Sequence, residues 1–105
     1  MSVDWKSIKI ELQNKYTEYR KYEKMSLCKK IGVQKIWKPS KTIEFGEYYI
    51  TIEYTHYSDW RVTWGELFIY EEYPEHNKKG QDDYNSFSTA FSEVNCIYNT
   101  LRDKK

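Results

Sequence analysis

The stretch from Tyr48 to Trp64 alternates between apolar and polar positions, and this period of two constrains the fold more than any other feature. Side chains of a β-strand point to opposite faces in turn, so strict alternation indicates a strand with one buried face. The sequence Tyr57–Asp59 interrupts the pattern with turn-forming residues. We therefore predict a β-hairpin. One face of its first strand would carry Tyr48, Ile50, Ile52 and Tyr54, the other face Tyr49, Thr51, Glu53 and Thr55, and the returning strand would bury Trp60, Val62 and Trp64.

Both flanks of this region have a helical period instead, with apolar residues three and four positions apart. Residues 3–24 predict an amphipathic helix capped by Ser2 or Asp4, and a break at residues 23–26 could separate it from a second helix ending at a left-handed Gly32. Residues 84–101 predict the main core helix, capped by Asp82 or Asp83. Its stripe consists of Tyr84, Phe87, Phe91, Val94, Tyr98 and Leu101.

Together these patterns predict one α+β domain spanning residues 1–105: a helix, a three- to four-stranded antiparallel meander and a helix. Both helices would cover the same face of the sheet in a two-layer sandwich. Residues 33–37 and 42–45 are shorter strand candidates, and a bulge at Gly65 would return Leu67 and Ile69 to the apolar face. Pro74 would end the sheet, leaving residues 75–83 as a polar loop.

The composition indicates a cytoplasmic protein with no membrane partner, because no apolar run approaches the length of a membrane span. Cys28 and Cys96 are expected to be small buried thiols rather than a disulfide or zinc ligands. The chain has 11 Tyr and 4 Trp. This excess of rings fits either the codon bias of an AT-rich genome or a contact surface, where such rings are enriched.

Catalytic and metal-binding motifs are not recognisable in the sequence. General acid–base chemistry needs convergent titratable groups, and the two histidines, His56 and His76, are both predicted in turns or loops. The cysteines and histidines are scattered singly, whereas metal ligands recur at matched spacing. We therefore expect no enzyme activity, no metal and no cofactor.

Charge is distributed unevenly along the chain. Residues 15–41 hold nine basic and two acidic side chains, a net charge of +7, whereas residues 42–83 hold three basic and ten acidic ones, a net charge of −7. Such asymmetry suggests a charged partner, although the two segments could also pair internally. A nucleic-acid-binding module using the first helix is one alternative, with phosphate contacts and stacking from Tyr16, Arg20, Lys21 and Lys24.

The leading hypothesis is a small protein that occludes a surface of another protein, as an inhibitor or immunity-type protein of a bacterium or a phage, including anti-defence proteins. An amphipathic, ring-rich sheet face left uncovered by the helices would supply the contact surface. The candidate partner-binding residues are Tyr49, Glu53, Trp60, Arg61, Glu71 and Glu72. An exposed edge strand would also allow a homodimer.

Overall fold

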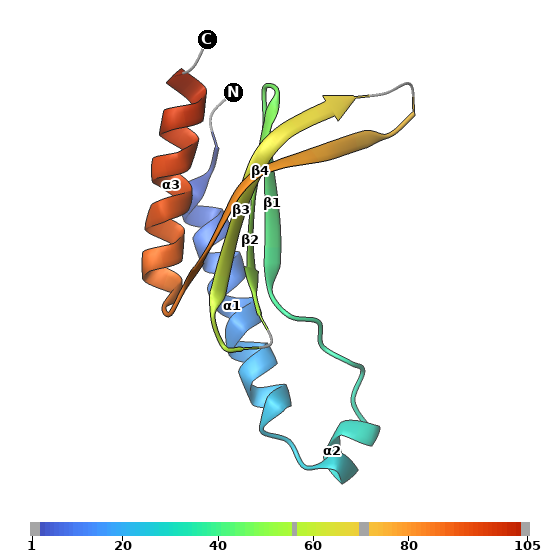
Figure 1. The fold of residues 1–105 in the computed structure, drawn as a ribbon. Coiled ribbons are helices and arrows are strands. Elements are labelled where there is room, and N and C mark those ends of the chain that lie inside the picture. Colours follow the sequence, from blue (N-terminus) through green and yellow to red (C-terminus); the bar gives the residue numbers. More distant parts are fainter. Residues whose placement is uncertain (1–2, 56, 70–71, 104–105) are drawn as a thin grey trace. The chain divides into compact units, whose positions relative to one another are not determined.

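The computed structural model describes residues 3–55, 57–69 and 72–103 of an α+β protein. Its internal contacts divide the chain into two compact units, residues 2–39 and residues 40–105 (Figure 1). The first unit is helical, and the second holds the sheet and the last helix. Within the described residues, no helix is long and apolar enough to cross a membrane. That all 105 residues form a single domain stays a prediction.

The first unit holds two helices, α1 (Trp5–Glu23) and α2 (Leu27–Ile31). Asp4 caps α1, as one of the predicted alternatives: its Oδ1 accepts from the Ser7 backbone N–H at 3.1 Å, and its Oδ2 accepts from the Ser7 hydroxyl at 2.7 Å. These hydrogen bonds favour the carboxylate and lower the pKa of Asp4. The helical segment does break before α2. The expected left-handed stop is wrong, because Gly32 has φ −88°.

The second unit is built on a four-stranded antiparallel sheet of the order β1-β2-β3-β4, which confirms the predicted meander. Its strands are β1 (Ser40–Phe45), β2 (Tyr48–Tyr54), β3 (Trp60–Ile69) and β4 (Pro74–Tyr84). The predicted hairpin is the β2–β3 pair, in which Ile52 lies opposite Val62. Residues 33–37, a strand candidate in the sequence, lie in no strand.

The fourth strand corrects the prediction of a loop at residues 75–83. This strand pairs with β3 on one side and forms an edge of the sheet, so backbone hydrogen bonds define it. Its side chains are almost all polar and show no apolar alternation, which is why the period gave no signal. Pro74 begins the strand instead of ending the sheet. A proline is tolerated at the first residue of an edge strand.

The predicted bulge lies at the expected point of the ladder but in the other strand. Trp64 pairs with Gly80 and Gly65 pairs with Lys78, so the extra residue is Lys79 of β4. Strand β3 therefore keeps its parity through Gly65, and Leu67 stays on the face opposite to Trp64. Its expected return to the apolar face is wrong, because only a bulge within β3 would change which side its residues face.

Helix α3 (Phe87–Asp103) packs on the apolar face of this sheet, which we call the near face. Ser86 caps the helix by accepting from the Thr89 backbone N–H at 3.2 Å, whereas Asp82 and Asp83, the predicted caps, belong to β4. Ring contacts join helix and sheet at both ends: Phe87 with Trp60 at 4.9 Å, and Tyr98 with Phe45 at 4.6 Å between centroids. That α1 also covers this face stays a prediction.

The core formed by α3 and the near face is tightly shielded. The fully buried residues are Ile50, Ile52, Val62 and Val94. Gly80 lies against the Trp64 indole, and a Cβ at residue 80 would overlap that ring, so the glycine makes room for it. These contacts fix α3 on one side of the sheet. Figure 1 shows α3 along the sheet and the ends of β3 and β4 extending beyond β2 as a bent arm.

The packing of α3 is tested by Phe91→Ala. Phe91 is buried beside the Phe87 ring, so we expect the free energy of unfolding to fall by about 3 to 5 kcal/mol, as for other buried Phe-to-Ala changes. Urea denaturation followed by circular dichroism measures it. Ser92→Ala on the exposed side of the helix is the control and should change stability by less than about 0.5 kcal/mol. A loss below about 1 kcal/mol for Phe91→Ala would contradict this packing.

Candidate protein-binding face

The side of the sheet opposite to α3, which we call the far face, is predominantly polar. The register of the four strands brings together, on this side, Ser40, Thr42, Glu44, Tyr49, Thr51, Glu53, Arg61, Thr63, Gly65, Leu67, His76, Lys78, Gln81 and Asp83. The prediction that Tyr49, Thr51, Glu53, Arg61 and Thr63 share one face, away from Ile50 and Ile52, is confirmed by this register.

A row of small hydroxyl side chains crosses the middle of the far face. Thr42 of β1 lies opposite Thr51 of β2, which lies opposite Thr63 of β3, and Gln81 of β4 continues the row. The hydroxyls of Thr42 and Thr51 are 2.9 Å apart and hydrogen-bonded. Short β-branched side chains have few rotamers, so the row forms a nearly fixed surface with hydrogen-bonding groups.

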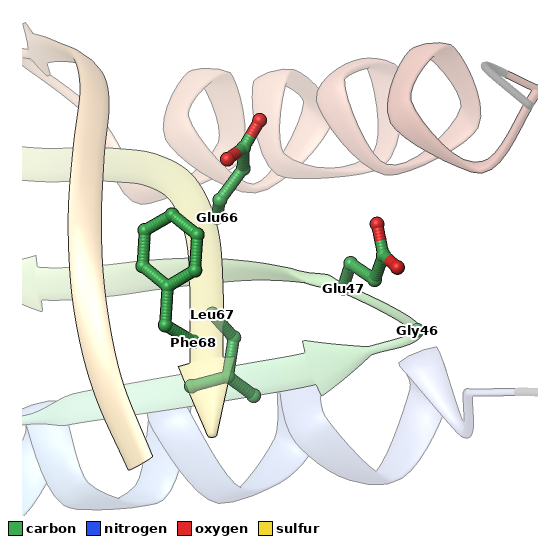
Figure 2. Close-up of a pocket in the computed structure, with 5 residues that line it drawn as sticks. All are labelled: Gly46, Glu47, Glu66, Leu67 and Phe68. Atoms are coloured by element: carbon green, nitrogen blue, oxygen red, sulfur yellow. The ribbon is translucent and has the colours of Figure 1, made fainter. Parts of the chain in front are cut away.

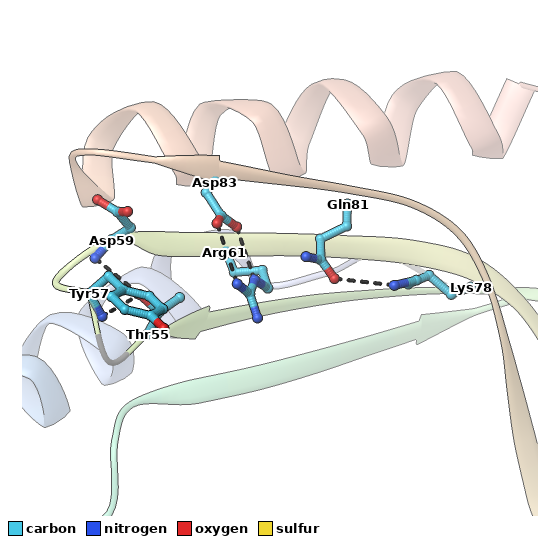
Figure 3. A network of polar contacts seen from close by, with 7 residues as sticks. All are labelled: Thr55, Tyr57, Asp59, Arg61, Lys78, Gln81 and Asp83. Atoms are coloured by element: carbon cyan, nitrogen blue, oxygen red, sulfur yellow. Dashed lines mark hydrogen bonds and ion pairs between the residues drawn. The ribbon is translucent and has the colours of Figure 1, made fainter.

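Beside this row lies an ordered set of polar contacts at the β2–β3 turn (Figure 3). Arg61 donates to both oxygens of Asp83, at 2.9 Å from Nε and 3.4 Å from Nη2. The hydrogen bond with Asp83 is the main reason that the pKa of Arg61 is raised. In the turn, the Thr55 hydroxyl accepts from the backbone N–H groups of Tyr57 and Asp59. The guanidinium is thus held in place at the rim of the far face.

The other end of the far face holds a cluster of three side chains. The Tyr49 ring stacks on the His76 imidazole with centroids 4.2 Å apart, and His76 Nε2 lies 3.7 Å from Glu44 Oε1. Glu44 and His76 belong to the two edge strands, which in a flat sheet would be roughly 14 Å apart at three strand spacings. The sheet must therefore curl toward its far side here, bringing β4 over Tyr49.

Gly65 makes room for this cluster in the centre of the sheet. It lies opposite Tyr49 in the ladder, and a Cβ at residue 65 would overlap the backbone carbonyl of Asn77 in β4. The close approach of β4 leaves Tyr49 only 4% exposed. Burial raises the pKa of the Tyr49 hydroxyl, because desolvation disfavours the tyrosinate.

The structure distributes the predicted partner-binding residues unevenly. Glu53 and Arg61 lie on the far face as Cα partners, while Tyr49 lies on it but is covered by His76. Trp60 is corrected to a core residue: it is 3% exposed on the near face, between Tyr54 and Phe87. Trp60 lies two residues before Val62 on the same strand, so the alternation of side chains already indicated that both point into the core.

The remaining predicted partner-binding residues belong to the connection between β3 and β4. Glu72 is exposed there, whereas Glu71 lies outside the described residues, as does His56 of the catalytic candidates. Asp83, Gln81 and His76 of the far face were missed in the sequence because they lie on β4. Only pairing of residues 74–84 with β3 would have revealed them.

The residues of the nucleic-acid alternative lie in the second half of α1 and just after it. Tyr16 and Arg20 are half-buried, Lys21 is exposed, and Lys24 is the exposed C-cap residue. Arg20 Nε is 3.8 Å from a Glu23 carboxylate oxygen. Tyr16, Arg20 and Lys24 are four residues apart and so follow one side of the helix, whereas Lys21 points to another.

The cysteines and the acidic groups do not form a reactive centre in the described part of the chain. Cys28 and Cys96 are free thiols and exposed, which corrects the expectation that both are buried. Cys28 lies on α2, which buries none of its side chains, and Cys96 lies on the outer side of α3. Among the described residues, no three His, Cys, Asp or Glu side chains are grouped to hold a metal ion.

Comparison of the chain with protein-family models, with curated proteins and with solved structures found no match.

The burial of Tyr49 is tested by alkaline titration of tyrosine absorbance in the wild type and in Tyr49→Phe. The difference between the two curves is the signal of one phenol, and we expect its midpoint above the ordinary pKa of 10.0. Because the folded-state pKa is raised, the associated stability is complete below about pH 10 and is lost as the pH rises through the folded-state value. His76→Ala should move the midpoint back down. A difference curve centred at pH 10 would contradict the burial of the Tyr49 hydroxyl.

Proposed function

We propose that this protein acts by occupying a surface of another protein with the far face of its sheet, as an inhibitor or immunity-type protein. The observation that supports the proposal most is the threonine row of Thr42, Thr51 and Thr63, placed on three adjacent strands on the side away from α3. The row lies between the Arg61–Asp83 pair and the Glu44–His76 pair.

Preorganisation is the physical reason that this face suits binding. Association loses affinity when side chains must be ordered, and the hydrogen bond between Thr42 and Thr51 and the two between Arg61 and Asp83 are made before any partner arrives. Groups of both charges flank the row, so a complementary partner would be steered and a wrong one repelled. Binding of this kind needs no chemical step, which agrees with a site made of threonines, one ion pair and a stacked histidine.

The test is the capture of a partner by the purified protein from a lysate of a low-GC bacterium at moderate salt, followed by affinity measurements with the purified partner. Thr51→Arg places a long charged side chain in the centre of the far face and should weaken binding by about tenfold or more, since it holds the partner away. Ser88→Arg adds the same side chain to an exposed position of α3 and should change the affinity by less than about twofold.

Three results would contradict the proposal. They are the absence of any captured protein, equal affinity of Thr51→Arg and the wild type, and an equal loss in Ser88→Arg. Binding to short single-stranded DNA that falls steeply with salt and is weakened by Lys21→Glu would instead favour the nucleic-acid alternative.

A further inference from the structure

The first unit exposes apolar side chains among lysines around α2. Leu27, Ile31 and Trp37 are 76%, 80% and 76% exposed. Residues 24–38, which we call the lysine segment, hold five Lys and no Asp or Glu. Two of its lysines lie over rings of the same unit: Lys30 Nζ is 5.0 Å from the Tyr22 centroid and Lys35 Nζ is 4.6 Å from the Trp37 centroid.

Single exposed apolar residues are ordinary, but Leu27 and Ile31 lie one turn apart on α2, and Trp37 follows in the same segment, in which every charged side chain is basic. The contacts of Lys30 and Lys35 with rings also keep these cations close to the apolar side chains. The lysine segment therefore combines exposed apolar side chains with basic ones.

The second unit carries a hollow with the complementary character. It has a volume of about 330 Å³ and is lined by Gly46, Glu47, Glu66, Leu67 and Phe68 (Figure 2). Gly46 adopts φ +55° in the turn between β1 and β2, a conformation that favours glycine, and this turn places Glu47 beside β3. The Leu67 backbone N–H donates to the Glu47 carbonyl at 2.7 Å, which holds the two sides of the hollow together.

Apolar and acidic groups are combined at this hollow. Phe68 is among the exposed large apolar residues, and Figure 2 shows its ring and the Glu47 and Glu66 carboxylates as the prominent side chains of the hollow. Glu75, a further acidic residue, lies opposite Phe68 in the ladder. Among the described residues, neither Glu47 nor Glu66 forms an ion pair. Their charge is thus available to a partner.

We propose that the lysine segment of one copy of this chain docks into the acidic hollow of a second copy. Leu27 and Ile31 would contact Leu67 and Phe68, and Lys29 would face Glu66. The net charges support this occupant: residues 2–39 carry ten basic and four acidic groups, or +6, and residues 40–105 carry seven and twelve, or −5. Each chain thus brings both halves of a complementary interface.

The side chains themselves favour a protein hollow over a nucleic acid as the occupant. A nucleic acid gains from phosphate contacts and from stacking on rings, and Trp37 offers one such ring, whereas Leu27 and Ile31, the exposed apolar residues of α2, offer no flat surface to a base. An apolar hollow removes both side chains from water, which is the larger gain. If the two docking events are reciprocal the assembly closes as a dimer, and if they are not it grows as a chain of copies.

Size-exclusion chromatography with mass detection, on the full chain across a wide range of concentrations, tests the proposal. We expect the wild-type mass to rise above that of one chain with concentration and to fall again as salt is added, since ion pairs border the interface. Lys29→Glu and Glu66→Lys should each weaken self-association by about tenfold or more, because each places like charges together. An equimolar mixture of the two variants should recover it, as the reversed charges meet.

Two further variants separate the apolar and the nonspecific contributions. Ile31→Ser should weaken association without changing its salt dependence, and Lys9→Glu, an exposed reversal on α1, should leave it unchanged. A single-chain mass at every concentration overturns the proposal, as does an unrecovered mixture or an equal effect of Lys9→Glu. A monomer that binds single-stranded DNA or anionic vesicles through Lys29 overturns it too. No captured partner is needed, so the result is independent of the proposed function.

Discussion

The packing of α3 on the near face of the sheet is the interaction on which the rest of this structure depends. A continuous set of rings runs from Tyr54 through Trp60 to Phe87 and Phe91, and Phe45 with Tyr98 closes the other end. These contacts bury Ile50, Ile52 and Val62 and so decide which side of every strand is apolar. Because side chains alternate along a strand, fixing one face as core assigns the polar residues to the other.

The far face follows from this constraint, and it presents an ordered set of polar side chains. Its centre is a row of threonines, the Arg61–Asp83 ion pair lies at one rim, and at the other the imidazole of His76 lies against Tyr49 beside Glu44. The curl of the sheet, which brings the edge strands β1 and β4 together at that end, makes the face more concave than its strand order indicates. We propose that such a surface binds a convex partner, and the acidic hollow lies at one end of it, because Leu67 belongs to both.

The secondary structure could be predicted from the sequence wherever the spacing of apolar residues reflects which side of a strand or helix is buried. The alternation from Tyr48 to Trp64 located the central hairpin, and the stripe through Phe91 and Val94 located α3. Strand β4 could not be found in this way, because an edge strand with polar residues on both sides is held by backbone pairing that has no residue signature. The far-face residues on β4 were missed for the same reason.

The other differences between the predicted and the observed positions follow from the alternation of side chains along a strand and from how much of each helix is buried. Trp60 has the even-numbered position of the core residues, and the general enrichment of Trp at interfaces does not outweigh this alternation. The exposure of Cys28 follows from α2, a short helix that buries none of its residues. The contact of Glu44 with His76 depends on the curl of the whole sheet, a property of tertiary structure that no local pattern encodes.

The central claim is that the far face is accessible in the free protein, and solvent paramagnetic relaxation of assigned methyl groups measures this most directly. A soluble paramagnetic agent should broaden the methyl signals of Thr42, Thr51 and Thr63 strongly, while those of Val62 and Val94 stay sharp in the core. Threonine methyls as protected as those of Val62 would show that the far face is covered within the molecule, and would contradict the account.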